Sequence, residues 1–486
     1  MPNNGFEGLR FVGYPVFEPL VQWDLGQADK PVGIKPGLAS EWKSDPADRK
    51  RWIFKLRPGV VFHDGTAFNA DAVVWNLQRF FDDKSPQFEP NGAAIVRGRV
   101  PVASWEKIDD MTVAIYTAAP LSYFPLQATY LLFASPTAFE KAGRSWSETA
   151  RAPAGTGPFR ITRVRPRTSV ELTRNADYWD KGRLAKVDRI VLVPMPEPMT
   201  RVAALQSDQV DWIEAPPPDS LASLKGDGFS IVQSSDNPNV WPYLLMAKAP
   251  SPFADARVRQ AANYAVDRDA LARLMGGTAK PAYGYWAKAD PNFGASANAY
   301  RYDPAKSLSL LKEAGLTPPV KVTVTIPTSG SGMMLPVPLN EMVQQSMAKA
   351  GFDVQFKVVE YGEVLVAVRQ PPDAPQNKGA DGLNIALLND VPSMYRWFPS
   401  ASATPKGNNW GHFQSPELDQ LAGEVAAEFD QGKAAQKLRR VSELLVDEAP
   451  WLYILSDLQP RALSAKVHGL VPAQSWFLDL TTVQAR

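Results

Sequence analysis

The stretch Phe54-Lys-Leu-Arg-Pro-Gly-Val-Val-Phe-His-Asp-Gly-Thr-Ala-Phe-Asn-Ala-Asp-Ala-Val-Val-Trp75 contains three structural signals in close succession. The alternation over residues 52–56 is typical of a strand, and Pro58-Gly59 and Asp64-Gly65 each indicate a turn. Asn69 or Asp71 then caps a helix, because the apolar residues that follow recur at helical spacing. The stretch therefore predicts a hairpin that leads into a capped helix.

The length and composition predict a globular chain of several domains. At 486 residues the chain is too long for one core, so we expect two or three domains. Hydrophobic residues make up 45% and charged residues 21%, and no apolar run approaches the ~20 residues that cross a bilayer.

The charged and sulfur-containing residues exclude several classes of function. Lys and Arg number 52 against 51 Asp and Glu, which predicts no broad basic face for nucleic acid or anionic lipid. There are no cysteines, so disulfides and sulfur-based zinc sites are excluded. The start, Met1-Pro-Asn-Asn-Gly5, lacks the basic and apolar regions of a signal peptide, so we expect none in this chain.

Strand and helix patterns alternate along the chain, which predicts an α/β architecture. Alternating residues predict strands at 112–116, 169–173, 189–193 and 321–326. Helical spacing predicts helices at 254–275, 304–314, 338–350, 416–429 and 433–447. Residues 369–379 are rich in proline and polar residues and predict an exposed loop.

Six further motifs accompany the opening stretch. They are Ile34-Lys-Pro-Gly-Leu-Ala-Ser-Glu-Trp42, Gly155-Thr-Gly-Pro-Phe159, Thr173-Arg-Asn-Ala-Asp-Tyr-Trp179, Pro252-Phe-Ala-Asp-Ala-Arg-Val-Arg-Gln-Ala-Ala-Asn-Tyr-Ala-Val-Asp267, Tyr302-Asp-Pro-Ala-Lys306 and Glu443-Leu-Leu-Val-Asp-Glu-Ala-Pro-Trp451. In this order and spacing the chain resembles the family 5, peptide- and nickel-type, extracellular solute-binding proteins of ABC importers. The resemblance covers nearly the whole chain.

The resemblance implies a two-lobed periplasmic-binding-protein-like fold of type II, the Venus-flytrap arrangement, with an extra third domain. Lobe one then takes residues 1–42, 157–244 and 457–486, the extra domain takes 43–156, and lobe two takes 245–456. Crossings near 242–250 and 454–460 would form the hinge. Two lobes that close on a solute convert binding energy into a shape that a transporter recognises.

Peptide-binding members of the family pair an aspartate on lobe two with the ammonium group of the ligand. The corresponding segment here is Asn384-Ile-Ala-Leu-Leu-Asn-Asp-Val-Pro-Ser-Met-Tyr-Arg-Trp397, which offers Asp390, with Asn389 beside it. Leu387 and Ser393 stand where the family has tryptophan and a second aspartate. The alternative for Asp390 is a turn-forming residue before Val-Pro.

Four aromatic residues and their neighbours are further candidates for the ligand site. Trp410, with Asn409, lies between Gly407 and Gly411, which favours an indole free to line a cleft over a buried strand. Trp241 and Tyr243 precede the first crossing, and Tyr14 lies in Gly13-Tyr-Pro15. The alternative for Trp410 is packing at the edge of lobe two, and the alternative for Trp241 and Tyr243 is a place in the core.

Arginine and histidine residues raise two other possibilities. Arg97, with Arg99, could bind a carboxylate or phosphate through paired hydrogen bonds, or could be solvated surface. In the nickel-binding members an arginine is expected in the segment that corresponds to 130–136, which has none here. The three histidines are far apart in sequence, so we expect no protein-built metal site and no cofactor.

Enzyme signatures do not appear in convincing form. Ser329-Gly-Ser-Gly332 lacks the spacing of a nucleophile elbow, and Gly155-Thr-Gly157 lacks the rest of a phosphate loop. The family resemblance implies a periplasmic or extracytoplasmic receptor, not an enzyme, and a hydrolase is the remote alternative. The receptor would bind a short peptide or peptide-like amine and deliver it to the permease subunits of an ABC importer as a monomer. An opine, a sugar conjugate or another small solute is the alternative, and a structural or chaperone-like module with an open groove is a third class.

Overall fold

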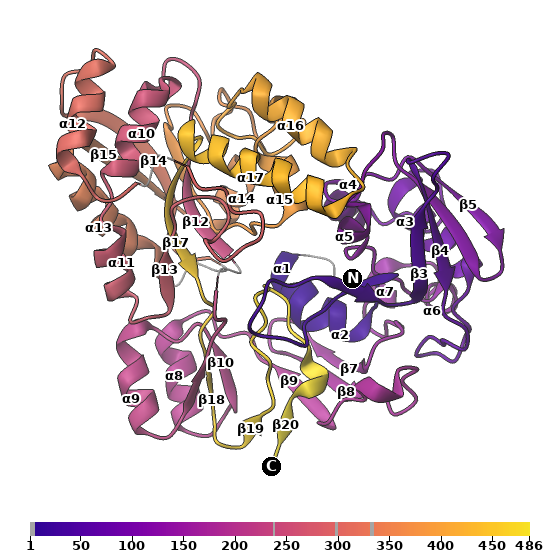
Figure 1. Ribbon diagram of the computed structural model, residues 1–486. Helices are drawn as coiled ribbons and strands as arrows, with labels where there is room; N and C mark the ends of the chain where they lie inside the picture. Colours follow the sequence, from indigo (N-terminus) through magenta and orange to yellow (C-terminus); the bar gives the residue numbers. More distant parts are fainter. Residues whose placement is uncertain (1–4, 237–238, 297–299, 331–334) are drawn as a thin grey trace. The chain divides into compact units, whose positions relative to one another are not determined.

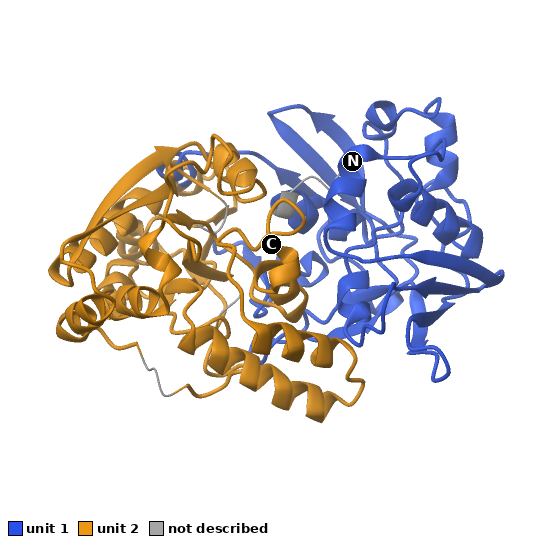
Figure 2. Cartoon of the chain, turned by 90° about the horizontal axis from the view of Figure 1, so that it is seen from above, with its two compact units in different colours: residues 1–201, 463–486 blue, residues 202–462 orange. Residues whose placement is uncertain are grey.

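The structure is a computed structural model that describes residues 5–236, 239–296, 300–330 and 335–486. It divides into two compact units, which Figure 2 shows in different colours. Unit 1 comprises Met1–Arg201 and Leu463–Arg486, and unit 2 comprises Val202–Ala462. Each unit has its own sheets and its own buried core, and each is described by itself.

The opening stretch of the sequence lies in a four-stranded antiparallel sheet of unit 1. The strand order is β3 (Ala39–Ser44), β4 (Arg51–Leu56), β6 (Thr112–Tyr116) and β5 (Ser104–Asp109). β4 buries Trp52, Phe54 and Leu56, as the alternation predicts. Helix α3 (Ala70–Phe81) follows, and the side chain of Asn69 accepts a hydrogen bond from the Ala72 amide at 3.0 Å. Of the two caps that the sequence left open, Asn69 is confirmed.

The rest of unit 1 consists of three small sheets and short helices, and the end of the chain completes it. The sheets are β1 (Val21–Trp23) with β2 (Ile34–Pro36), β7 (Phe159–Arg165) with β8 (Ser169–Arg174) and β9 (Arg189–Leu192), and β19 (Val467–His468) with β20 (Gln484–Ala485). The helices are α1 (Gly5–Gly8), η1 (Leu9–Gly13), α2 (Tyr14–Val16), α4 (Pro90–Arg97), α5 (Phe124–Ala128), α6 (Pro136–Lys141), α7 (Trp146–Thr149), η2 (Lys181–Arg183) and η6 (Leu480–Thr482).

Unit 2 is built on a six-stranded mixed sheet, and Figure 1 labels its strands except β16. Its order is β13 (Ala279–Pro281), β17 (Trp451–Asp457), β12 (Asn239–Leu245), β16 (Gly382–Asn384), β14 (Val320–Pro327) and β15 (Phe352–Val359). β14 runs parallel to β15 and β16, whereas β12 runs antiparallel to β16 and β17. Trp241 and Tyr243 pack in one hydrophobic cluster, and Val240 and Leu244 pack in another, so both faces of β12 are buried.

Helices and one further sheet surround this core. The sheet has the order β10 (Trp212–Glu214), β18 (Arg461–Leu463) and β11 (Ser230–Val232). The helices are α8 (Pro198–Gln206), η3 (Pro218–Ser220), α9 (Leu221–Gly226), η4 (Pro252–Ala254), α10 (Ala256–Tyr264), α11 (Arg268–Leu274), α12 (Pro304–Glu313), α13 (Pro336–Lys349), α14 (Tyr361–Ala367), α15 (Val391–Trp397), η5 (Ser400–Ser402), α16 (Pro416–Ala426) and α17 (Gln431–Asp447).

The elements predicted from sequence are largely confirmed, with one correction. The four predicted strands correspond to β6, β8, β9 and β14, and residues 369–379 contain no helix or strand. The single helix predicted over 254–275 is wrong, because it is two helices. The carboxylate of Asp267 accepts a hydrogen bond from the Ala270 amide at 3.0 Å and starts α11 as a new helix.

Two predictions about larger segments stay as predictions. Residues 202–244, assigned above to lobe one, fall in unit 2, and residues 43–156, assigned to an extra domain, fall in unit 1. The three-part division is a finer scheme than these two units. The loop at 329–332 lies partly outside the described residues.

Among the described residues, no helix combines the length and the apolar character needed to span a membrane.

Candidate functional site

His63, from the opening stretch, holds the Gly155-Thr-Gly157 turn in unit 1. Its Nδ1 accepts a hydrogen bond from the Gly155 amide at 3.2 Å, and its Nε2 lies 3.0 Å from the Gly157 carbonyl oxygen, to which it donates. Burial lowers the pKa of His63 to about 4, so the imidazole is neutral at pH 7. A Cβ on Gly155 would lie 2.0 Å from the Val16 carbonyl oxygen, so this turn needs glycine to approach that backbone.

Glu18 is the centre of a buried network that joins this turn to another of the sequence motifs. Its carboxylate accepts hydrogen bonds from the Tyr178 hydroxyl at 2.6 Å, the Trp179 indole at 2.7 Å and the Thr156 hydroxyl at 3.0 Å. Burial raises the pKa of Glu18, and these donors oppose that rise. Two of the motifs that carry the family resemblance in unit 1 are therefore joined through Glu18 inside the unit.

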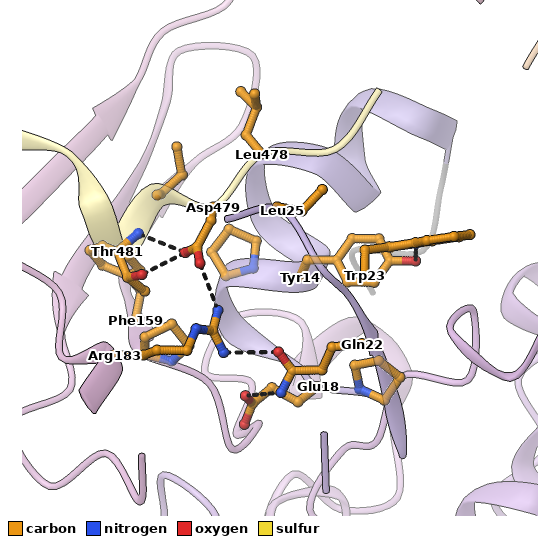
Figure 3. Close-up of a pocket in the computed structure, with 14 residues that line it drawn as sticks. Tyr14, Glu18, Gln22, Trp23, Leu25, Phe159, Arg183, Leu478, Asp479 and Thr481 are labelled. Carbon is orange, nitrogen blue, oxygen red and sulfur yellow. Dashed lines mark hydrogen bonds and ion pairs between the residues drawn. The ribbon is translucent and has the colours of Figure 1, made fainter. Parts of the chain in front are cut away.

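A small cavity lies beside this network (Figure 3). Its volume is about 40 Å³, enough for about one water molecule. Arg183 crosses one side, where it donates to the Gln22 side-chain oxygen at 2.8 Å and to the Asp479 carboxylate at 3.0 Å. Although burial raises the pKa of Asp479, the charge of Arg183 and bonds from Thr481 lower it overall. This cavity is too small for a peptide.

Tyr14 lines the same cavity, at the end opposite Arg183 in Figure 3. Its hydroxyl donates to the Thr129 carbonyl oxygen at 3.0 Å and accepts from the Trp23 indole at 3.3 Å. Phe477 packs against the rings of both Tyr14 and Trp23. Tyr14 is half-buried, and its predicted role in ligand binding stays a prediction.

Asp390 lies at the start of α15 in unit 2. Its Oδ1 accepts a hydrogen bond from the Ser393 amide at 2.7 Å, so the carboxylate is the N-cap of this helix. Pro392 follows at the second helical position, where its missing N–H leaves no bond unmade. The alternative that the sequence left open, a local backbone role for Asp390, is thus present in the structure. A ligand-binding role is compatible with it, because a carboxylate can accept several hydrogen bonds.

Tyr285 fixes the backbone of the segment that carries Asp390, and sequence reasoning missed it. Its hydroxyl donates to the carbonyl oxygens of Asp390 at 2.9 Å and Leu388 at 3.3 Å. In return, the Asn389 side-chain amide donates to the Tyr285 carbonyl oxygen at 3.2 Å. Burial raises the pKa of Tyr285 well above its usual value. The signal was the aromatic run Tyr283-Gly-Tyr-Trp286, which no helix or strand pattern explained.

Leu387, at the family's tryptophan position, is part of the core. It exchanges two backbone hydrogen bonds of 2.9 Å with Val240 and belongs to one hydrophobic cluster of unit 2. No aromatic platform therefore stands at this position beside Asp390.

The prediction that Trp410 is free to line a cleft is wrong. Its side chain is 1% exposed and packs in the hydrophobic core of unit 2. The flanking glycines serve close backbone packing instead, because a Cβ on Gly411 would lie 2.0 Å from the Leu245 carbonyl oxygen. Asn409 is also buried, and its side chain donates to the Phe413 carbonyl oxygen at 2.7 Å and accepts from the Phe413 amide at 3.0 Å. Both residues shape a turn.

Trp241 and Tyr243 also lie in the core, which corrects the expectation that they face a cleft. They share one face of β12 and pack in a single buried cluster. The Tyr243 hydroxyl donates to the Asn340 side-chain oxygen at 2.5 Å, which supplies the partner that a buried phenol needs. Both side chains are therefore buried and not exposed.

Arg97 lies at the end of α4 in unit 1 and is bound locally. It donates to the Phe80 carbonyl oxygen at 2.6 Å and forms an ion pair with Asp83. It also lines an open pocket of about 670 Å³ with Phe81 and Trp105. A ligand carboxylate or phosphate would compete with Asp83 for Arg97, and the ligand-binding role of Arg97 stays a prediction.

Among the described residues, no group of three His, Asp or Glu side chains could hold a metal ion.

Comparisons with known proteins give a family match over most of the chain. The family model described as bacterial extracellular solute-binding proteins, family 5 Middle, matches residues 33–405. The glutathione-binding protein GsiB of Pectobacterium atrosepticum is 29% identical over 440 residues, covering 87% of this chain and 80% of that protein. The dipeptide-binding protein of Escherichia coli K12 is 26% identical over 476 residues, covering 94% and 86%.

A comparison with solved structures confirms the fold class. The dipeptide-binding protein of Pseudoalteromonas sp. SM9913, in complex with Met-Leu, superposes with a TM-score of 0.83 at 21% identity, covering 100% of this chain and 97% of that chain. The mixed α/β periplasmic-binding-protein fold expected from the motifs is thus the fold of this chain.

Proposed function

Because the chain belongs to the bacterial extracellular solute-binding proteins of family 5, we propose that it captures a short peptide or peptide-like amine outside the cytoplasm and passes it to an ABC importer. The solute is bound and released unchanged, so the protein is a receptor and not an enzyme. The permease subunits of the importer are its protein partners, and the receptor acts as a monomer. Capture by closure of two lobes follows from the family resemblance.

The position of Asp390 is the observation that favours a ligand with an amino group. Its carboxylate is half-buried, and the backbone that bears it is held by Tyr285. A carboxylate fixed in this way binds an ammonium group without first being ordered, which lowers the entropy lost on binding. Glutathione and dipeptides, named for two relatives, each contain a free amino group. Asn389, Tyr14 and Arg97 are the other residues that we retain as candidate ligand contacts.

The departures at Leu387 and Ser393 support the second candidate, a receptor for an opine, a sugar conjugate or another non-peptide solute. Leu387 is in the core, and Ser393 uses its backbone amide to bind Asp390. This segment therefore lacks two polar or aromatic groups found at the corresponding positions of peptide-binding members. We expect an amino group of such a solute to bind the Asp390 carboxylate as well.

Thermal melting with matched ligands tests the proposal. A panel of dipeptides and glutathione is compared with the same compounds acetylated at the amino group, because acetylation removes the positive charge and two N–H donors while adding an acetyl group. We expect at least one free amine to raise the melting temperature by mass action and its acetylated form to lose the effect. Equal shifts for both forms would contradict an ammonium–carboxylate contact. Mass spectrometry of the compound after incubation separates capture from turnover.

A further inference from the structure

The segment that contains β7, β8 and β9 carries an unusual excess of arginine. Residues 159–193 contain seven Arg and two Lys against four Asp and Glu, a net charge of +5, whereas the whole chain has a net charge of +1. The balance over the whole chain hides this local excess, so the expectation of no broad basic face holds only as an average. Arginine dominates over lysine here, and its planar fork binds phosphate and carboxylate through two hydrogen bonds.

The strand register places several of these arginines on one face of the sheet. Arg163 of β7 lies opposite Glu171 of β8, which lies opposite Val191 of β9. Arg165 pairs with Ser169 and Arg189 pairs with Thr173, which are two residues from Glu171 on either side. Because side chains alternate between faces, these residues share one face, which we call the arginine face. Leu172 and Phe159 are on the opposite face and are buried.

The arginine face is exposed and keeps a positive excess. Arg163 and Arg189 are 56% and 63% exposed, and both lie near Glu171, at 3.6 and 4.0 Å. The single carboxylate of Glu171 therefore neutralises only part of the charge of these two arginines. Arg165, and Arg167 in the connecting turn, are exposed and form no ion pair with any carboxylate that the structure describes. Ion pairs at this exposure and distance are weak, so an anion could compete for the arginines.

Apolar side chains accompany the charges. Val191, and Val193 just beyond β9, are each 44% exposed. The three strands lie side by side in Figure 1. The face has no aromatic side chain among its described residues, and large aromatic anchors are typical of protein–protein hot spots. An exposed cluster of arginines with small apolar residues between them complements the anionic headgroup region of a bilayer.

We propose that the arginine face binds the anionic phospholipid headgroups of a membrane surface. Arg163, Arg165 and Arg189 contact phosphates, Arg167 adds charge from the turn, and the two valines contact the interfacial region. The attraction is electrostatic and acts within about 10 Å at 0.1 M salt. Such binding keeps the receptor near the membrane that holds an importer. It is independent of which solute the protein captures.

Vesicle sedimentation tests this proposal with the full chain. Binding is measured on vesicles of phosphatidylcholine alone and on vesicles with phosphatidylglycerol. We expect binding only to the anionic vesicles and its loss at 0.5 M salt. The triple variant Arg163→Gln, Arg165→Gln, Arg189→Gln should bind roughly a hundredfold more weakly, since each basic residue contributes about fivefold.

A second triple variant is the control. Lys312→Gln, Lys321→Gln and Lys349→Gln remove the same charge from exposed positions of unit 2 that have no described ion pair, and we expect this variant to bind as the wild type does. Equal loss in both variants, or none in the arginine variant, would overturn the proposal. Binding of the wild type to an importer in neutral-lipid nanodiscs, with no binding to anionic vesicles, would assign the face to a protein partner instead. Circular dichroism melting of each variant checks that the sheet remains folded.

Discussion

Glu18 in unit 1 and Asp390 in unit 2 both have carboxylates fixed by hydrogen bonds, but their surroundings differ. Glu18 is buried and accepts hydrogen bonds from Tyr178, Trp179 and Thr156, which all belong to motifs of the family. Asp390 is half-buried, caps a helix, and lies in a segment that departs from the family pattern at two positions. Two of the motifs that carry the family resemblance therefore stabilise the fold through Glu18, whereas the segment that we assign to the ligand departs from the family pattern.

The largest expected effect is on the Glu18 network. Replacing Glu18 by Ala removes the acceptor for three donors, of which Tyr178 and Thr156 are buried. We expect the free energy of unfolding to fall by about 3 to 5 kcal/mol. Urea unfolding measures this. The control is Glu41→Ala on the exposed side of β3, which should change stability by less than about 0.5 kcal/mol. A loss below about 1 kcal/mol at Glu18 would break the contrast between the two carboxylates.

The dependence of stability on pH sharpens the comparison by testing His63 in unit 1. Its pKa in the folded chain is about 4, below the ordinary value of 6.5, because burial disfavours the imidazolium. A lowered pKa of histidine means that its contribution to stability is full above pH 6.5 and is lost as the pH falls toward 4. We expect wild-type protein to lose up to about 3 kcal/mol more over this window than His63→Gln does. Parallel stability curves for the two proteins would show that His63 is not held neutral.

The turn at Trp410 provides a structural test within unit 2. Gly411→Ala places a Cβ against the Leu245 carbonyl oxygen, and we expect a loss of about 2 kcal/mol in unfolding free energy. Gly423→Ala on α16 is the matched control, because a Cβ there meets nothing within 4 Å and alanine favours the helix. If Gly411→Ala is as stable as the wild type, the close packing of this turn is incorrect.

The smallest expected effect separates the two roles of Asp390. Asp390→Ala removes the cap of α15 and should lower the unfolding free energy by about 1 kcal/mol, whereas Asp390→Asn keeps an effective cap and should stay within about 0.5 kcal/mol of wild type. Chemical denaturation of both variants measures the difference. Equal losses for Ala and Asn would mean that the charge at Asp390, and not the cap, stabilises this segment.

The fold could be predicted from the sequence because turns, caps and strand alternation are local signals. The strand at 52–56, the Asn69 cap and the fold class are confirmed. The candidate site was predicted less well, because burial depends on distant segments. The two glycines around Trp410 favour an exposed indole only until the packing of Gly411 on Leu245 is known. Tyr285 could not be assigned, because its partner segment lies about one hundred residues away along the chain.

The central claim is that the motif network determines stability and the Asp390 segment determines binding. Isothermal titration of one amine ligand against Asp390→Asn and Glu18→Gln, together with urea unfolding of both, tests this most directly. Asp303→Asn, which changes the cap of α12, is the control. We expect Asp390→Asn to weaken the Kd roughly thirtyfold, or about 2 kcal/mol, at nearly unchanged stability. Glu18→Gln should lose about 1 to 2 kcal/mol of stability and keep its Kd. An unchanged Kd in Asp390→Asn, or a weakened Kd in Glu18→Gln, would contradict the account.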